Sequence, residues 1–179
     1  MTNVGTVYGE AIYALAQEEN LTDTILPQLE MLEQCFADQS GYVDLLACQS
    51  LPKQERCGLL DESIKNAVHP YLLNFLKILV EKGYIRHFHH CCEAYRRCYY
   101  RDNGILPVTA VTALPLTSQQ TQRLKEKLSA QTGKTILLTN EVDKDLLGGM
   151  RLNYDGKQVE DSISHRLETI RQTLKNTVL

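Results

Sequence analysis

Histidine and cysteine side chains that could bind a metal or act as a nucleophile gather in one short segment. Imidazole and thiolate groups suit zinc, and a Cys/His pair can also supply a nucleophile with its base. On a helix, His87, Cys91 and Cys98 would share one face. His89 and Cys92 would point elsewhere, and no second ligand pair at zinc-finger spacing follows. We therefore expect neither a metal site nor a catalytic pair, but buried thiols that pack as small apolar groups among surface histidines. The cluster consists of His87, His89, His90, Cys91, Cys92 and Cys98.

Basic and aromatic side chains are interleaved in the same segment, as they are in some surfaces that bind nucleic acid. They are Tyr95, Arg96, Arg97, Tyr99, Tyr100 and Arg101. The formal charge of the whole chain is −3, which argues against a polyanionic partner. We expect a solvated basic helix end whose charges complement the helix dipole, and no nucleic acid.

Gly148 and Gly149 could be mistaken for part of a phosphate-binding loop. They lack the Lys and Ser/Thr of a P-loop and the third glycine of a dinucleotide fingerprint, and they precede a predicted strand. A turn that requires a positive φ is the better account. No two nearby carboxylates are paired as a general acid and a general base. The sequence thus contains no enzyme signature, and we expect no cofactor.

The composition is that of an ordinary globular protein. With 179 residues, 43% apolar and 23% charged, the chain can form one large domain or two small ones. No apolar run approaches the roughly twenty residues that span a bilayer, and the N-terminus lacks the basic and apolar blocks of a signal peptide. Six cysteines without an export signal predict free thiols rather than a disulfide framework.

Charge is distributed unevenly along the chain. Residues 1–62 hold two basic and eleven acidic side chains. Residues 63–179 hold the other seventeen basic and eleven acidic ones, so they are net positive by six. Such a dipole could orient a docking partner.

The elements that position these residues are helical up to about residue 103. Two early apolar sets recur at i, i+3 or i+4, and i+7, so each set occupies one helix face. They are Val4, Tyr8, Ala11 and Leu15, then Ile25, Leu29, Leu32 and Phe36. A shorter apolar cluster lies at 42–46, and Pro52 and Pro70 are placed to open two further helices.

The helix after Pro70 is apolar nearly all round, as helices are that lie centrally in a bundle or beneath a second protein. Its apolar residues are Leu72, Leu73, Phe75, Leu76, Ile78, Leu79 and Val80. Gly83 can end this helix with a left-handed cap, and Gly104 can end the next one. That last helix, about 84–103, carries the stripe Ile85, Phe88, Cys92, Tyr95 and Tyr99. These patterns predict a bundle of five or six short helices.

After Gly104 the pattern changes to mixed strands and helices. Apolar and Thr residues at 108–113 predict a strand covered on both faces. Thr117 and Gln120 make a capping box for a helix that Gly133 closes. A second strand should follow around 136–138.

The remaining elements are a hairpin and a final helix. Alternation at 150–154, followed by Asp155-Gly156, predicts a hairpin with a return strand through Val159. Asp161 and Ser162 can cap a last helix. Its apolar face is Ile163, Leu167, Ile170 and Leu174. We predict two domains, an all-α N-terminal helical bundle at 1–104 and a small α+β domain at 105–179.

Two of the N-terminal helices carry more apolar surface than one packed face requires. The first helix combines small residues with Tyr8 and Leu15, and with the helix at 71–80 it could form a groove for an amphipathic helix of another protein. Alternatively, these faces pack only on each other.

Motifs spread over nearly the whole chain link it to a known family. The first comprises Tyr8, Ala11, Ile12 and Ala16, with Gly9 in place of the usual alanine. The second comprises Asn74, Phe75, Leu76, Leu79 and Gly83, with Tyr84 where arginine is usual. The third comprises Val142, Asp143, Leu146, Gly148 and Gly149, and Glu160-Asp161-Ser162 stands where the family has Asp-Gly-Ser. In this order the motifs resemble the delta subunit of the rotary proton-translocating ATP synthase, the mitochondrial oligomycin-sensitivity-conferring protein.

The resemblance implies a non-catalytic stator subunit. Its six-helix N-terminal domain would receive the N-terminal helix of an alpha subunit in a groove between the first and fifth helices. Its C-terminal domain would dock on the C-terminal helices of the peripheral-stalk b subunits. The partner-binding residues implied are Tyr8, Ala11, Ile12, Leu15, Phe75, Leu76, Leu79, Val142, Asp143, Leu146, Gly148 and Gly149.

The resemblance also implies a place in the cell. The protein would lie at the cytoplasmic face of a bacterial inner membrane, held there only through the complex. Two other classes stay open, namely a helical adaptor unrelated to ATP synthase and a small metal or redox protein that uses the His/Cys cluster.

Overall fold

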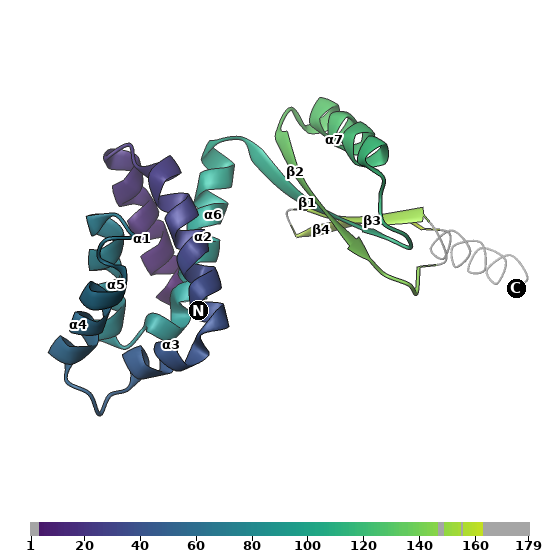
Figure 1. The fold of residues 1–179 in the computed structure, drawn as a ribbon. Coiled ribbons are helices and arrows are strands. Elements are labelled where there is room, and N and C mark those ends of the chain that lie inside the picture. Colours follow the sequence, from purple (N-terminus) through teal and green to yellow (C-terminus); the bar gives the residue numbers. More distant parts are fainter. Residues whose placement is uncertain (1–3, 147–148, 155, 163–179) are drawn as a thin grey trace, which may run out of the picture. The chain divides into compact units, whose positions relative to one another are not determined.

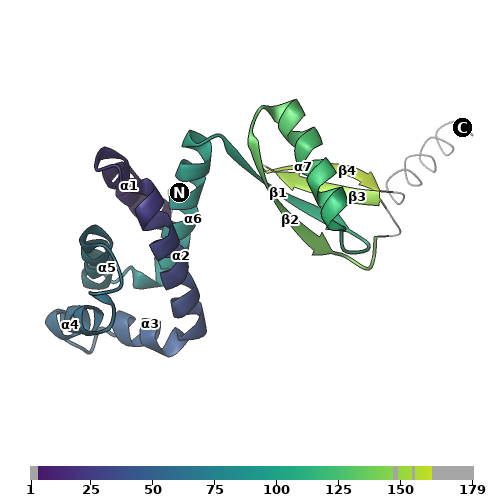
Figure 2. The ribbon, with the colours of Figure 1, turned by 45° about the horizontal axis from the view of Figure 1, so that its top comes forward.

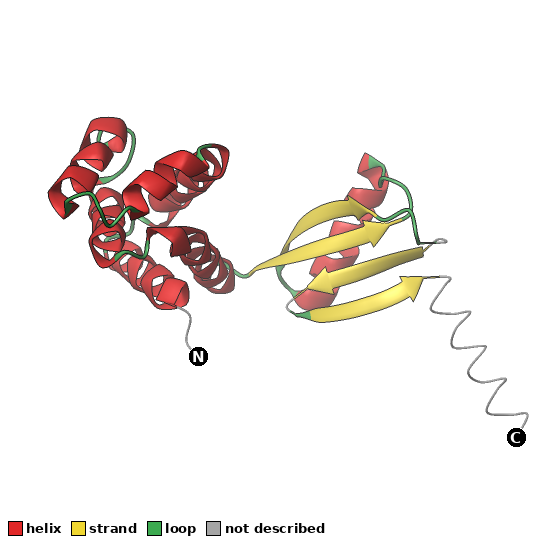
Figure 3. Ribbon diagram, turned by 90° about the horizontal axis from the view of Figure 1, so that it is seen from below, coloured by secondary structure: helices red, strands yellow, loops and turns green. Residues whose placement is uncertain are grey.

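A computed structural model describes residues 4–146, 149–154 and 156–162 of the chain. The chain divides into two compact units, Met1–Tyr99 and Tyr100–Leu179, and each is described by itself. An all-helical part is followed by a part that contains a sheet, as predicted (Figure 3). The assignment of 1–104 and 105–179 as the two domains remains a prediction.

The first unit is built from helices (Figures 1 and 2). They are α1 (Val4–Glu18), α2 (Thr22–Asp38), α3 (Ser40–Ala47), α4 (Lys53–Ile64), α5 (Pro70–Lys82), the 3₁₀ turn η1 (Ile85–His87) and α6 (Phe88–Asp102). The predicted helix at 84–103 is therefore interrupted near its start, where η1 precedes α6. Within the described residues, no helix is long and apolar enough to cross a membrane.

Helix boundaries follow the proline and glycine signals. Pro52 precedes α4, and Pro70 is the first residue of α5, where its missing N–H leaves no internal hydrogen bond unmade. Gly83 ends α5 with φ 76°, and its N–H donates to the carbonyl oxygens of Leu79 and Val80. Gly104, beyond the end of α6, has φ 62°. These predictions are confirmed.

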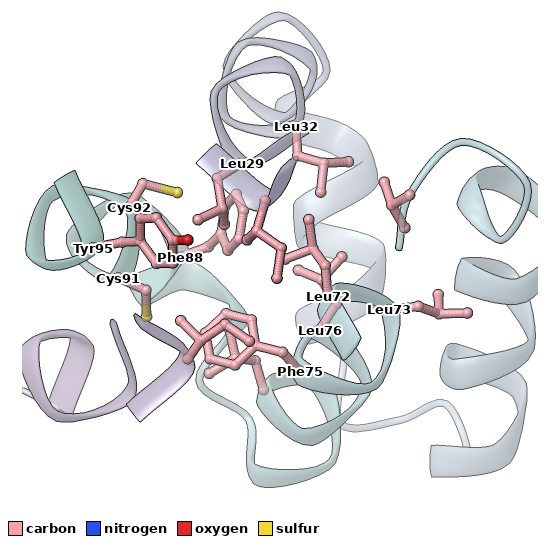
Figure 4. Packing of buried hydrophobic residues seen from close by; sticks show 14 of the residues in the cluster. Leu29, Leu32, Leu72, Leu73, Phe75, Leu76, Phe88, Cys91, Cys92 and Tyr95 are labelled. Carbon is pink, nitrogen blue, oxygen red and sulfur yellow. The ribbon is translucent and has the colours of Figure 1, made fainter. Parts of the chain in front are cut away.

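The core of the first unit lies around α5 and the inner faces of α2 and α6 (Figure 4). All four predicted residues of α2 are buried, as are all but Tyr99 of the stripe predicted for 84–103. On α5 the apolar ring is buried except at Ile78, whose exposed fraction is 45%. Helix α5 is therefore central to the unit, as its all-round apolar surface predicts.

The predicted inner face of α1 is wrong. Its buried residues are Gly5, Gly9, Ile12, Tyr13 and Ala16. The predicted set of Val4, Tyr8, Ala11 and Leu15 is half-buried, or exposed in the case of Ala11. The helix is rotated because its two glycines face α6, and Tyr13 packs against Tyr95 of that helix with ring centroids 5.2 Å apart.

The second unit is a four-stranded sheet with one helix. Its elements are β1 (Ile105–Thr112), α7 (Ser118–Thr132), β2 (Thr135–Val142), β3 (Gly149–Tyr154) and β4 (Lys157–Ser162). The strand order is β2-β1-β3-β4; β1 and β2 are parallel, and the other two neighbouring pairs are antiparallel. Helix α7 is the crossover between the parallel strands and lies on one face of the sheet (Figure 3).

The predicted local signals of this unit are present. Thr117 and Gln120 form the capping box of α7, and Gly133 ends that helix with φ 67°. Tyr154 pairs with Lys157, so the hairpin has a two-residue loop, in which Gly156 has φ 69°.

The cover predicted for both faces of the strand at 108–113 is confirmed, since Val108, Ala110, Val111 and Thr112 are buried and Thr109 is half-buried. Outside that range the sheet is less covered. Leu106, Val108, Ile136 and Leu128 of α7 form a small core on one face. On the other face Pro107 is exposed and Leu137 is 47% exposed. The return strand β4 continues past Val159 to Ser162. The predicted final helix lies outside the described residues.

Candidate partner-binding surfaces

Helix α1 approaches α6 closely because of two glycines one turn apart. A Cβ at Gly5 would lie 2.5 Å from Cβ of His90, and one at Gly9 would lie 2.7 Å from Cβ of Ala94 and overlap the carbonyl oxygen of Cys91. Neither contact is sterically allowed, so both positions require glycine at this separation. The four-residue spacing of the glycines was the sequence signal for this contact, and our prediction of the helix face missed it.

Most of the predicted groove residues belong to the core. Ile12, Phe75, Leu76 and Leu79 are buried, with Leu76 and Leu79 fully enclosed. Tyr8 and Leu15 are half-buried at the edge of the core, and Tyr8 packs against Tyr84 with ring centroids 5.8 Å apart. Ala11 is exposed. Of the residues assigned to this groove, only Tyr8, Ala11 and Leu15 of α1 are therefore open to a partner.

A different apolar stripe is exposed on α1. Val7, Ala11 and Ala14 follow i, i+4, i+7 spacing, and all three are exposed, Val7 at 50%. Ile78 is the exposed apolar residue of α5, the helix beside α1 in Figures 1 and 2. Neither Val7 nor Ile78 was among the predicted partner-binding residues, although the spacing of the α1 stripe is visible in the sequence.

One pocket of the first unit lies away from α1 and α5. Its volume is about 250 Å³, and it lies among α2, α3 and the start of α6. Its lining combines apolar side chains with three polar ones: Glu33, Phe36, Ala37, Val43, Ile85, Arg86, Phe88 and His89.

The His/Cys cluster serves packing and a link to α2. Cys91, Cys92 and Cys98 are buried thiols. His89 Nδ1 lies 2.6 Å from Glu33 Oε1. Among the residues that the structure describes, no three His, Cys, Asp or Glu side chains are placed to hold a metal ion together.

At this link between α6 and α2, the surroundings favour the ionised forms of Glu33 and Arg96. Burial alone would raise the pKa of Glu33, but the hydrogen bonds and charge of Arg96, helped by His89, outweigh it and lower that pKa. The bond to Glu33 raises the pKa of Arg96. Burial raises the pKa of the Cys91 thiol to about 11 and that of Cys92 further, so neither is a nucleophile near neutral pH.

The basic and aromatic residues of α6 bind acidic residues of α1 and α2. Arg97 forms an ion pair with Glu10 at 3.0 Å, and the Tyr99 hydroxyl donates to Asp23 at 2.6 Å. Two further ion pairs join the acidic first third to later basic residues, Lys77 with Asp61 and Arg86 with Asp44. Much of the charge asymmetry along the sequence is thus neutralised inside the first unit.

In the second unit the Val-Asp motif builds a turn. Asp143 N donates to the carbonyl oxygen of Thr112, Asp143 Oδ1 accepts from Asp145 N, and Asp143 Oδ2 accepts from Arg151 at 3.1 Å. Leu146 is buried, and Gly149 has φ 85°, as predicted for this turn. Gly148 lies outside the described residues. Among the described residues of the motif, Val142 presents the most apolar surface, at 47% exposed.

A partly buried polar network, which we did not predict from the sequence, lies beside this turn. Asn140 Nδ2 donates to Ala110 O and Thr112 Oγ1, and Asn140 Oδ1 accepts from Leu116 N. The network fixes the loop after β1, and the loop displays Leu114 with 77% of its surface exposed. Since Thr112 and Val142 are paired in register, Leu114 and Val142 lie near the same end of the parallel strands.

Comparisons with known proteins give matches that cover nearly the whole chain. Residues 4–174 match the family model described as ATP synthase delta (OSCP) subunit. The chain is 27% identical over 172 residues to ATP synthase subunit delta of Clostridioides difficile (strain 630), covering 96% of this chain and 95% of that protein. It is 28% identical over 175 residues to ATP synthase subunit delta of Acetivibrio thermocellus, covering 97% and 98%.

A solved structure supports the fold. A chain in the cryo-EM structure of the Toxoplasma gondii mitochondrial ATP synthase hexamer superposes with a TM-score of 0.76. The match covers 97% of this chain and 98% of that one at 18% sequence identity.

Proposed function

The chain belongs to the ATP synthase delta (OSCP) family, and we propose that it links the alpha subunits of the catalytic head to the b subunits of the peripheral stalk. Members of this family are structural, non-catalytic subunits of the synthase. Rotation of the central shaft would drag the head with it unless a stator resisted the torque. Binding without turnover is then the whole function, and two interfaces on one chain act in series.

We assign the head side to the exposed stripe of α1 together with α5. An amphipathic helix from an alpha subunit can lay its apolar face along Val7, Ala11 and Ala14 and against Ile78. The small alanines allow close approach of the two helices. Covering the exposed halves of Val7 and Ile78 contributes on the order of 1 kcal/mol for each side chain. Ile78 is exposed although the other apolar residues of α5 are buried. This exposure is the observation on which the assignment rests.

On the stalk side we propose the apolar surface at the ends of β1 and β2. Val142 and Leu114 are exposed there, while Asp143, Leu146 and Gly149 shape the turn that supports Val142. Docking of a b-subunit helix would cover both exposed side chains. The position at the cytoplasmic face of a bacterial inner membrane follows from these two attachments, and membrane association through the complex alone is part of the proposal.

Leu76 was predicted to bind the partner, but a charged residue there is a poor test of the head-side surface. Because Leu76 is fully buried, a charge there would unfold the unit whether or not a groove exists. Ile78→Glu places the charge at the surface instead. We expect this variant to keep its helical circular dichroism and to lose at least about tenfold in affinity for an alpha-subunit N-terminal peptide, because the carboxylate would be desolvated on docking.

Met31 offers the matched control, since it is 42% exposed on α2. Met31→Glu should bind the peptide with unchanged affinity. If both variants bind as tightly as the unchanged protein in isothermal titration calorimetry, the head-side assignment is wrong.

A further inference from the structure

The pocket among α2, α3 and the start of α6 has an apolar floor made of Phe36, Val43, Ile85 and Phe88. The two phenyl rings meet edge to face with centroids 5.1 Å apart. All of these side chains except Val43 are at most 9% exposed, so the floor is rigid core. A cavity of roughly 150 Å³ in another protein takes up benzene. At about 250 Å³, this pocket has room for an aromatic ring with a short chain.

The acidic residue of the pocket wall already has partners at both of its oxygens. Glu33 Oε1 lies 2.6 Å from His89 Nδ1 and accepts from Arg96 Nη2 at 3.2 Å. Glu33 Oε2 accepts from Arg96 Nη1. The charge of Arg96 therefore balances that of Glu33 within the protein. A cationic ligand in the pocket would have to compete with Arg96 for this carboxylate.

The basic residue of the wall keeps unpaired donors. Arg86 Nη2 donates to Asp44 Oδ1 at 2.8 Å, in an ion pair whose two side chains are both exposed. Within the described part of the chain, Arg86 Nε and Nη1 have no acceptor. Asp44 is not part of the pocket lining, and an exposed pair of this kind contributes little stability. The planar guanidinium can therefore donate to a second carboxylate, one that is bound in the pocket.

We propose that this pocket binds a small aromatic monocarboxylate. The ring of the ligand packs on the floor, where Phe36 and Phe88 offer the edge and face contacts that aromatic rings prefer. A short chain leads from the ring to the rim, where the carboxylate accepts from Arg86. The site shares no residue with the surfaces that we propose bind the head and the stalk, so the ligand would occupy a third site on the chain.

An NMR titration of the full chain with 4-phenylbutanoate tests this proposal. The methyl groups of Val43 and Ile85 report on the pocket, and those of Val7, Ile78 and Val142 report on other exposed apolar surfaces. We expect saturable shifts at Val43 and Ile85 with a Kd on the order of 1 mM, as suits a ligand of about twelve non-hydrogen atoms. The probe 4-phenylbutylammonium has the same apolar body and the opposite charge, and it should bind at least about tenfold more weakly.

Two exposed arginines supply a variant and its control. Arg86 and Arg97 each form one exposed ion pair, with Asp44 and Glu10, but only Arg86 lines the pocket. Arg86→Gln should lower the affinity for 4-phenylbutanoate about tenfold, whereas Arg97→Gln should leave it unchanged. The proposal is overturned by shifts no larger in the pocket than at the other apolar surfaces, by equal affinities for the two probes, or by equal affinities of the two variants.

Discussion

At the scale of single residues, glycines and one buried arginine decide how closely the helices of the first unit approach. Gly9 has a neighbouring backbone carbonyl where a Cβ would stand, and Arg56 joins the C-terminal carbonyl groups of α3 and α5. Neither role requires an apolar side chain, so neither is visible in hydrophobic periodicity.

Gly9→Val should destabilise the first unit by about 1–3 kcal/mol, because the new side chain must push α1 away from α6. Urea denaturation followed by circular dichroism measures the change. The control is Gly58→Ala in α4, where a Cβ meets nothing within 4 Å, and this variant should be neutral or stabilised by a few tenths of a kcal/mol. Equal stabilities of the two variants would contradict the close α1–α6 contact.

Arg56→Met should cost about 1–3 kcal/mol, since two buried carbonyl oxygens lose their donor. The comparison is Arg86→Met, which removes the exposed ion pair with Asp44 and should change the free energy of unfolding by less than about 0.5 kcal/mol. Finding Arg56→Met as stable as Arg86→Met would show that the two carbonyl bonds contribute nothing.

Glu33 gives the first unit a stability that depends on pH. Because its pKa is lower when folded than when unfolded, its contribution is present above the unfolded value near 4.3 and disappears as pH falls through the folded value. Glu33→Gln should therefore be less stable than the unchanged protein at pH 7, and this difference should shrink below about pH 4. A difference that stays constant from pH 7 to pH 3 in urea titrations would refute the role of ionised Glu33.

At the scale of elements, the sequence predicted where helices and strands begin and end better than which face they bury. Proline, glycine and capping signals act locally, so α5 and α7 begin and end where expected. The face of α1 depends on the partner it meets, and the small residues that allow close packing carry little hydrophobic signal. The sequence also could not separate Leu76 from Ile78, because a core and a docking surface are built from the same side chains.

Thr117→Ala tests the capping box of α7 and should cost the second unit about 1 kcal/mol, because the N–H of Gln120 loses its acceptor. Hydrogen exchange at the α7 amides reports on this unit separately from the first. Protection factors identical to those of the unchanged protein would argue that packing alone holds the start of α7.

At the scale of the whole molecule, the two units resemble each other in one respect, since each exposes apolar residues on otherwise well-formed elements. Val7 and Ile78 mark the first unit, and Leu114 and Val142 the second. Family membership states that such a chain is a structural part of ATP synthase, and the two surfaces are our account of how it connects head and stalk.

The most direct test of that account is ATP-driven proton pumping by membrane vesicles whose synthase lacks this chain. Adding back the unchanged protein should restore pumping, whereas Ile78→Glu should restore little, although it remains folded and ATP hydrolysis by the head continues. Full restoration by Ile78→Glu, or complete coupling in vesicles without the chain, would contradict the claim that this protein holds the head to the stalk.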